Sequence, residues 1–186
     1  MKIFTIAEQE PVAIVMSIDE MVDNLSRIKE LDLNVISIRD SESGRSEQMR
    51  QAYATIDSAG LGNLYVEIFD DLAEPFEQKM GLVFPQSEHV SGILDWAKQK
   101  WEENGKRFVV HCTGGVSRSS AIAMLINQMI MNDYRAGWDI KLHSPNHKVL
   151  EYGEQHLGVE PFKDIVQQET KEYDKKRFEE EDYNPF

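Results

Sequence analysis

The residues whose types and spacing are best suited to catalysis form one short stretch around Cys112, the single cysteine of the chain. The stretch reads His111-Cys112-Thr113-Gly114-Gly115-Val116-Ser117-Arg118-Ser119. A loop of five residues that enters a helix can turn its backbone N–H groups inward and form an anion nest at the positive end of the helix dipole. Glycines permit the unusual backbone angles and the close approach of main chain to phosphate that such a nest requires. We therefore predict a phosphate loop, residues 113–118, composed of Thr113, Gly114, Gly115, Val116, Ser117 and Arg118.

Two side chains of this stretch are suited to act on a bound phosphate. The planar fork of Arg118 can bind two phosphate oxygens at once. A thiol at a helix N-terminus beside a guanidinium is stabilised as the thiolate, which is its nucleophilic form. Cys112 could then attack phosphorus in line, while Arg118 and the loop amides hold the charge of the transition state. The alternative, a small buried hydrophobic cysteine, is disfavoured by the residues around it.

With these residues the sequence resembles the protein tyrosine phosphatase superfamily, whose H-C-x5-R-[ST] signature is matched at all four fixed positions. The resemblance is greatest to compact bacterial-type dual-specificity-like members and covers residues 10–158. It implies that the Ser119 hydroxyl helps to release the thiolate from the intermediate. It also implies that His111 orients the loop rather than acting as a base.

Such a reaction needs an acid, because the leaving alkoxide or phenolate must be protonated, and the same carboxylate can later activate water. Phe69-Asp70-Asp71 supplies two candidates. Relatives with this string usually use the second aspartate, so the resemblance favours Asp71, with Asp70 as the alternative. The separation from Cys112 is 112 − 71 = 41 residues, more than in compact relatives. We expect the additional residues in Ala73 to Phe84, as a longer and lid-like loop.

The rest of the chain alternates between two patterns. β-branched runs predict strands at Val12–Ser17, Val35–Arg39, Leu64–Phe69 and Arg107–His111. Apolar residues at helical spacing predict helices at Asp19–Leu31, Gln48–Ala59, from Pro85 to Asn104 and at Ser117–Met131, with two more beginning at Ser144-Pro145-Asn146 and at Pro161. This alternation predicts an α/β fold, in which a central, mostly parallel sheet is flanked by helices, and the resemblance implies that this is the fold of a cysteine phosphatase. We expect one domain, residues 1–168, and a charged C-terminal tail, residues 169–186.

Charge and cysteine content restrict the partners. The net charge is −13, from 33 acidic and 20 basic residues, and such a surface repels nucleic acid and anionic lipid. One cysteine can form neither an intrachain disulfide nor a structural zinc site, and the mechanism above requires no cofactor or metal. The N-terminus lacks the apolar region of a signal peptide and no apolar run could span a bilayer, so we expect a cytoplasmic protein without membrane contact.

The sequence thus predicts a cysteine-dependent phosphatase that hydrolyses phosphotyrosine, with phosphoserine and phosphothreonine as further candidates. Residues 113–117 contain no base to meet additional phosphates, which favours a phosphoprotein or a small aryl phosphate over a phosphoinositide. The alternative is a catalytically weak phosphate-binding module of the same fold. A thiol-cascade reductase is disfavoured, because it needs a second cysteine. The oligomeric state stays open.

Overall fold

A computed structural model of the protein describes residues 10–72 and 81–181. Its four described strands, β1 (Ala13–Met16), β2 (Asn34–Arg39), β3 (Leu64–Ile68) and β4 (Phe108–His111), form one sheet in the order β1-β4-β2-β3. All three pairings are parallel, so the predicted parallel sheet is confirmed. The two inner strands, β2 and β4, are buried along their whole length, as expected for strands that are covered on both faces.

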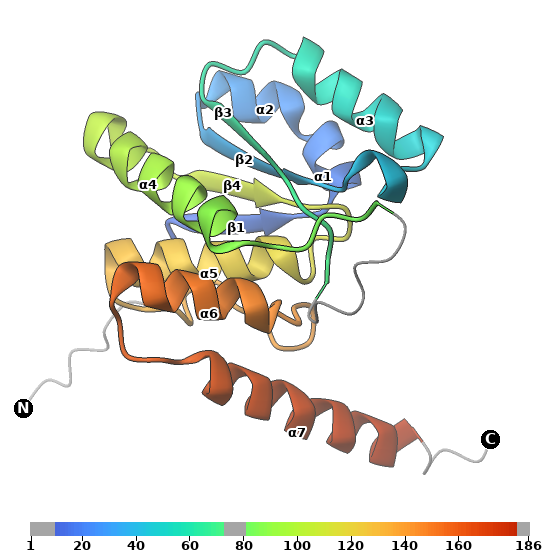
Figure 1. Cartoon of the computed structure of the whole chain (residues 1–186). Coiled ribbons are helices and arrows are strands. Elements are labelled where there is room, and N and C mark those ends of the chain that lie inside the picture. Colours follow the sequence, from blue (N-terminus) through green and yellow to red (C-terminus); the bar gives the residue numbers. More distant parts are fainter. Residues whose placement is uncertain (1–9, 73–80, 182–186) are drawn as a thin grey trace, which may run out of the picture.

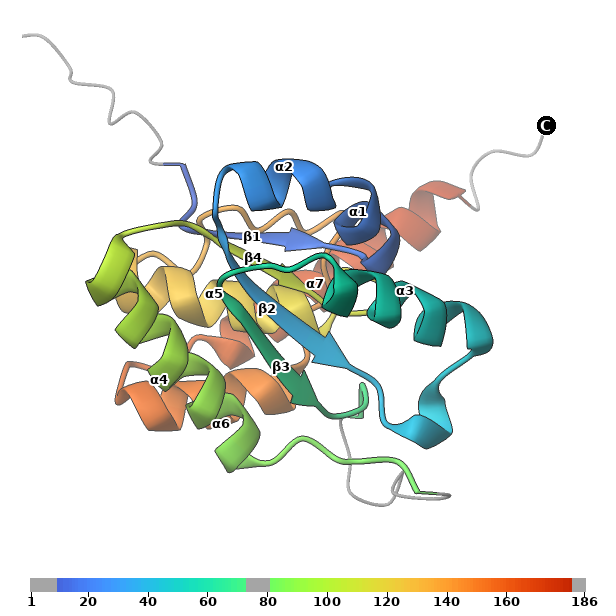
Figure 2. The same cartoon turned by 90° about the horizontal axis from the view of Figure 1, so that it is seen from above.

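Helices cover the two faces of this sheet (Figures 1 and 2). One face carries α1 (Ile18–Asp23), α2 (Leu25–Glu30) and α3 (Glu47–Ser58). The opposite face carries α4 (Ser87–Asn104), α5 (Arg118–Met131) and α6 (His147–Leu157). A short 3₁₀ helix, η1 (Glu42–Gly44), precedes α3. Among the residues described, no helix combines the length and the apolar character needed to cross a bilayer.

Most predicted elements agree with the observed ones within a residue or two, but the single helix predicted for Asp19–Leu31 is wrong. The segment contains two short helices that meet at Asn24, whose backbone leaves the helical region with φ −103° and ψ 6°. The Asn24 side chain donates to the Glu20 carbonyl oxygen at 2.8 Å. An asparagine side chain that bonds to a nearby backbone group competes with the helix, which explains the break.

The prolines before the last two helices also lie further out than predicted. Pro145 precedes Asn146, and the Asn146 side chain caps α6 by accepting from the backbone N–H groups of Lys148 and Val149. Pro161 likewise lies two residues before the first residue of α7 (Lys163–Glu181). Both helices therefore begin just after the proline rather than at it.

The last helix, α7, runs without a break through the boundary predicted at residues 168 and 169. Its first turns are anchored, because Phe162 and Val166 are buried and the Phe162 ring stacks on Tyr134 with ring centroids 4.3 Å apart. Arg135 forms a two-pronged ion pair with Glu169. Figure 1 shows the rest of α7 extending along the outside of the helical layer.

The edge strand β1 is tied to helix α5 by one buried side chain. Asn127 accepts from the Ala13 backbone N–H at 2.9 Å and donates to the Ala13 carbonyl oxygen at 3.2 Å. Its side-chain amide also donates to the Ala136 carbonyl oxygen at 2.8 Å. The orientation of α5, which begins at the candidate site, is thereby fixed relative to the sheet.

Candidate active site

The phosphate loop connects the inner strand β4 to helix α5, so the sheet delivers Cys112 directly to the N-terminus of a helix. Neighbouring segments hold its carbonyl groups. Thr113 O accepts from Ile18 N at 3.2 Å, and Val116 O accepts from Ser144 N at 3.1 Å. Within the described chain, no protein group accepts a hydrogen bond from the backbone N–H groups of residues 113–117. The carbonyls of Thr113 and Val116 are therefore occupied while the loop amides are available, which suits an anion.

Only one of the two loop glycines is required by the backbone. Gly115 has φ +69°, and a Cβ placed on it would lie 2.6 Å from Ser17 N and 2.8 Å from Met16 C. Gly114 has no positive φ, and a Cβ added to it would meet only the Val116 side chain, at 3.8 Å. The expectation that both glycines adopt unusual angles is thus wrong for Gly114, while at Gly115 the end of β1 approaches too closely for a side chain.

Cys112 directly precedes the loop, and only 2% of its surface is exposed. Its Sγ is 3.1 Å from Ser119 Oγ, and Ser119 is fully buried in the first turn of α5. Since a hydroxyl is a good donor to sulfur, this contact is the one that a leaving or resting thiolate would use. The structure thus brings together two of the four predicted catalytic residues at hydrogen-bond distance.

Arg118 is buried beside the same loop, with 3% of its surface exposed. Nη1 donates to the Phe69 carbonyl oxygen at 2.8 Å. Nη2 lies 3.0 Å from Asp40 Oδ1 and 3.4 Å from Thr113 Oγ1. The guanidinium is therefore held at a defined place, and its Nε has no hydrogen-bond partner among the described residues.

The two aspartates of the predicted acid string have different surroundings. Asp70 is buried, and its carboxylate accepts from the backbone N–H groups of Ser41 at 3.1 Å and Val83 at 2.6 Å. Asp71 is exposed, and its Oδ1 accepts from the Ser117 hydroxyl at 2.7 Å. Asp70 thus joins two loops, whereas Asp71 is in direct contact with the phosphate loop.

The predicted lid-like segment, Ala73 to Phe84, lies largely outside the described residues, which resume at Gly81.

Asn146 is a site residue whose part was not predicted from the sequence. Its side-chain amide donates to Asp71 Oδ1 at 2.8 Å and to the Leu72 carbonyl oxygen at 3.2 Å. Its backbone N–H donates to Ser117 O at 3.3 Å. Asn146 thus links the aspartate, the phosphate loop and α6. An asparagine directly before a helix predicts an N-terminal cap of that helix. The sequence spacing does not predict its hydrogen bond to Asp71, which lies 75 residues away.

His111 is completely buried at the end of β4, and neither ring nitrogen has a hydrogen-bond partner among the described residues. Burial, followed by the nearby positive charge of Arg39, lowers the pKa of His111 to about 4. The ring is neutral at ordinary pH, and His111 lies two residues before the first residue of the loop. This position is compatible with an orienting role, as the resemblance implies.

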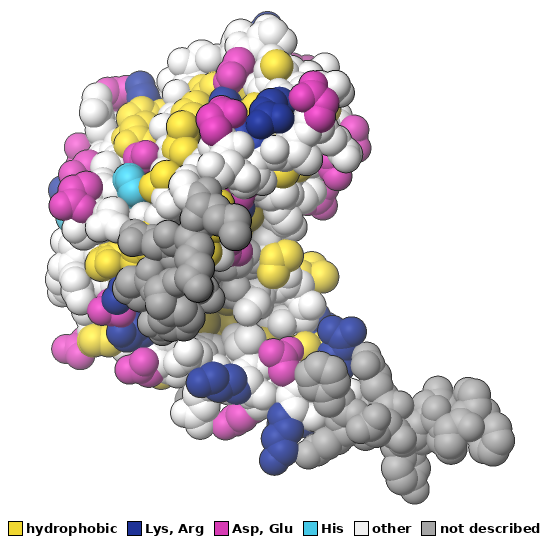
Figure 3. All heavy atoms as spheres, turned by 45° about the vertical axis from the view of Figure 1, so that its right-hand side comes forward, with side chains coloured by type: hydrophobic (Ala, Val, Ile, Leu, Met, Phe, Trp, Pro, Cys, Tyr) yellow, Lys and Arg dark blue, Asp and Glu magenta, His cyan; other side chains and the backbone are white. Residues whose placement is uncertain are grey.

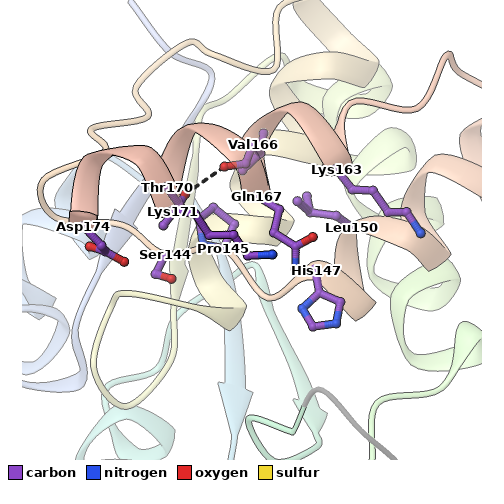
Figure 4. Close-up of a pocket in the computed structure, with 10 residues that line it drawn as sticks. All are labelled: Ser144, Pro145, His147, Leu150, Lys163, Val166, Gln167, Thr170, Lys171 and Asp174. Atoms are coloured by element: carbon purple, nitrogen blue, oxygen red, sulfur yellow. Dashed lines mark hydrogen bonds between the residues drawn. The ribbon is translucent and has the colours of Figure 1, made fainter. Parts of the chain in front are cut away.

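A pocket of about 210 Å³ lies between α7 and the segment that begins at Ser144 (Figure 4). None of the predicted site residues lines it. Of its lining residues, Ser144 donates through its backbone N–H to Val116 O of the phosphate loop, and Pro145 directly precedes Asn146. On the face shown in Figure 3, basic side chains occur singly among acidic ones, without an extended basic patch.

Comparisons with known proteins gave matches among solved structures alone. No family model matches the chain, and a search of curated proteins found no significant match. The crystal structure of Tk-PTP in the active form is 18% identical, with 86% of this chain and 90% of that chain covered and a TM-score of 0.40. The crystal structure of PTPMT1 is 12% identical, with 91% and 98% covered and a TM-score of 0.42. The Siw14 catalytic core is 14% identical, with 88% and 84% covered and a TM-score of 0.36.

These likenesses are distant, so the interpretation of the site depends on its own geometry. The parallel sheet delivers Cys112 from an inner strand into a loop with available amides. The following helix begins with Arg118 and Ser119. The chain therefore has an α/β fold in which a parallel sheet and helix α5 bring a cysteine, an arginine and a serine to one loop whose amides are available.

Proposed function

We propose that this chain is a cysteine-dependent phosphatase that hydrolyses phosphate monoesters, with phosphotyrosine as its preferred substrate class. The observation that carries the proposal is the convergence of Cys112 Sγ and the Ser119 hydroxyl, 3.1 Å apart, on a loop whose amides have no protein acceptor among the described residues. The buried guanidinium of Arg118 completes the cradle. Amides and a guanidinium around one thiol are what a phosphoryl group in transfer needs.

In the first step, the Cys112 thiolate attacks phosphorus in line as the bond to the ester oxygen breaks. The leaving oxygen takes a proton from Asp71, so that an alcohol or phenol departs and a cysteinyl phosphate remains. The amides of the phosphate loop and Arg118 hold the charge on the three other phosphate oxygens. No redox partner is involved.

In the second step, water attacks the same phosphorus and the sulfur–phosphorus bond breaks. Asp71, now ionised, accepts the proton from the water, and inorganic phosphate is released. The Ser119 hydroxyl, 3.1 Å from the sulfur, donates to the thiolate as it leaves. The enzyme returns to its starting protonation state.

The hydrogen bonds of Asp71 support its role as the acid. Ser117 and Asn146 both donate to Oδ1, at 2.7 and 2.8 Å. Oδ2 is therefore the oxygen that can carry the transferable proton. Asp70 suits the role less, because both of its oxygens accept from backbone N–H groups.

The depth of the thiol supports phosphotyrosine as substrate. Cys112 is 2% exposed and Arg118 is 3% exposed, so a phosphate must reach inward to contact them. A tyrosine ring extends its phosphate several ångströms further from the peptide backbone than a serine or threonine side chain does. A phosphotyrosine side chain therefore fits a recessed sulfur better.

The test is to assay the purified chain on para-nitrophenyl phosphate and on matched peptides that carry phosphotyrosine, phosphoserine or phosphothreonine, with a phosphoinositide panel alongside. We expect hydrolysis with phosphotyrosine preferred, and no hydrolysis by Cys112→Ser, because a hydroxyl cannot replace the thiolate. Turnover by Cys112→Ser would exclude the mechanism. Phosphate binding without turnover by the unaltered chain would instead favour the weak binding module.

A further inference from the structure

Asp40 lies directly after β2 and contacts the residue that the proposed mechanism uses to clamp phosphate. Its Oδ1 is 3.0 Å from Arg118 Nη2. Both side chains are largely removed from solvent, with 14% of Asp40 and 4% of Arg118 exposed. A buried guanidinium needs a nearby negative charge, because an unpaired charge in the interior is costly.

The second oxygen of Asp40 binds the opposite end of the phosphate loop. Oδ2 accepts a hydrogen bond from the Thr113 hydroxyl and, at 3.3 Å, another from the Tyr53 hydroxyl of α3. Thr113 is the first residue of the loop and Arg118 is the last. One carboxylate therefore joins the two ends of the loop, and α3 holds that carboxylate in place.

The contacts of Arg118 show which of its donors are left for a ligand. Asp40 and Thr113 engage Nη2, and the Phe69 carbonyl oxygen engages Nη1. Nε has no partner among the described residues. A two-pronged contact with phosphate uses two N–H groups of the guanidinium. Asp40 engages Nη2 and not Nε, so the buried Nε–H keeps a hydrogen-bonding capacity that no described protein group uses.

We infer that Asp40 is a positioning residue of the active site: it orients Arg118 toward bound phosphate and fixes Thr113 at the start of the loop. The inference rests on the proposed function and extends it to a residue outside the H-C-x5-R-S signature. Asp40 touches neither the substrate nor the reacting atoms. Its effect is exerted through the guanidinium.

The test compares Asp40→Asn and Asp40→Ala with the unaltered chain. The control is Asp57→Asn, which removes a carboxylate from a neighbouring two-pronged pair with Arg39 and leaves Arg118 untouched. We expect kcat/KM to fall roughly 100-fold in Asp40→Ala, since a misplaced clamp has an effect of that order, and less in Asp40→Asn, which keeps an acceptor oxygen. Asp57→Asn should retain the activity of the unaltered chain.

Two readouts separate positioning from a merely structural role. Binding of inorganic phosphate, measured by calorimetry in the Cys112→Ser background, should weaken about tenfold or more in Asp40→Asn although the protein stays folded by circular dichroism. The ratio of rates for good and poor leaving groups should not change, because Asp71 is not affected. Asp40→Asn keeps the size of the side chain, so its phosphate binding tests the positioning role even if Asp40→Ala does not fold.

The results also distinguish this inference from the proposed function. If the unaltered chain hydrolyses para-nitrophenyl phosphate and Asp40→Asn binds phosphate as tightly as the control, Asp40 has no positioning role and the proposed function stands. If the unaltered chain binds phosphate without hydrolysis, the proposed function fails. In that case, weaker phosphate binding by Asp40→Asn would still support the inference, and unchanged binding would overturn it.

Discussion

The side-chain amide of Asn146 donates to Oδ1 of Asp71 at 2.8 Å, across 75 residues of sequence. The other end of the same side chain caps α6. The position of Asp71, the proposed acid, therefore depends on where α6 begins. This relationship explains why an exposed aspartate has a defined place in the site.

We predict that Asp71→Asn lowers kcat by about 10²- to 10⁴-fold for an ester with a poor leaving group, because its leaving oxygen needs a proton. The loss should be much smaller for para-nitrophenyl phosphate, whose leaving phenolate needs little protonation. Steady-state rates on aryl phosphates of graded leaving-group pKa measure the difference.

The matched control is Asp70→Asn. It should lower stability, because the backbone N–H groups of Ser41 and Val83 lose a charged acceptor at the buried Asp70 side chain, a loss of about 1–3 kcal/mol. Its sensitivity to the leaving group should stay that of the unaltered chain. A steeper dependence in Asp70→Asn than in Asp71→Asn would reverse the assignment.

We predict that Arg118→Lys lowers kcat/KM by about 10²-fold or more, because an ammonium cannot reproduce a two-pronged contact. It would also lose the simultaneous contacts to the Phe69 carbonyl and Asp40. Kinetics on para-nitrophenyl phosphate and calorimetry with inorganic phosphate measure both effects. Unaltered kinetics in Arg118→Lys would contradict the clamp.

We predict that Gly115→Ala disrupts the phosphate loop. A methyl group there would lie 2.6 Å from Ser17 N on a backbone with φ +69°, and such strain costs about 1–3 kcal/mol. Phosphate binding and the unfolding temperature should both fall. Gly114→Ala is the matched control, because its methyl would meet only Val116 at 3.8 Å, and its unfolding temperature should stay unchanged. Equal unfolding temperatures in the two variants would show that the approach of β1 does not restrict the loop.

The buried His111 predicts a dependence of stability on pH. Its pKa is about 4 in the folded protein and about 6.5 when unfolded. Between these values the unfolded chain takes up a proton that the folded chain does not. The free energy of unfolding therefore falls as pH decreases from 6.5 toward 4, by up to about 3 kcal/mol from this residue.

Urea unfolding of the unaltered chain and of His111→Leu at pH 7.5 and pH 5 measures this contribution. The loss of stability on acidification should be smaller in His111→Leu. An identical response of His111→Leu and the unaltered chain would show that His111 does not titrate differently in the two states.

Local sequence patterns predicted the sheet, most helix boundaries and the loop from Cys112 to Ser119, because each depends on residues close together in the chain. Asp40 and Asn146 were not assigned a part in the site for the opposite reason. Their partners, Arg118 and Asp71, lie 78 and 75 residues away, as 118 − 40 and 146 − 71 show. Spacing also could not predict the break at Asn24, where a side-chain hydrogen bond overrides the apolar periodicity.

The side-chain amide of Asn127 restricts strand pairing between copies of this chain at β1. Ala13 lies on β1, an edge strand, and its N–H and carbonyl face away from β4, where another chain could pair with them. Asn127 occupies both groups as a neighbouring strand would. Strand pairing by another chain is thus blocked at Ala13, by a single side chain of the same helix that begins at the candidate active site.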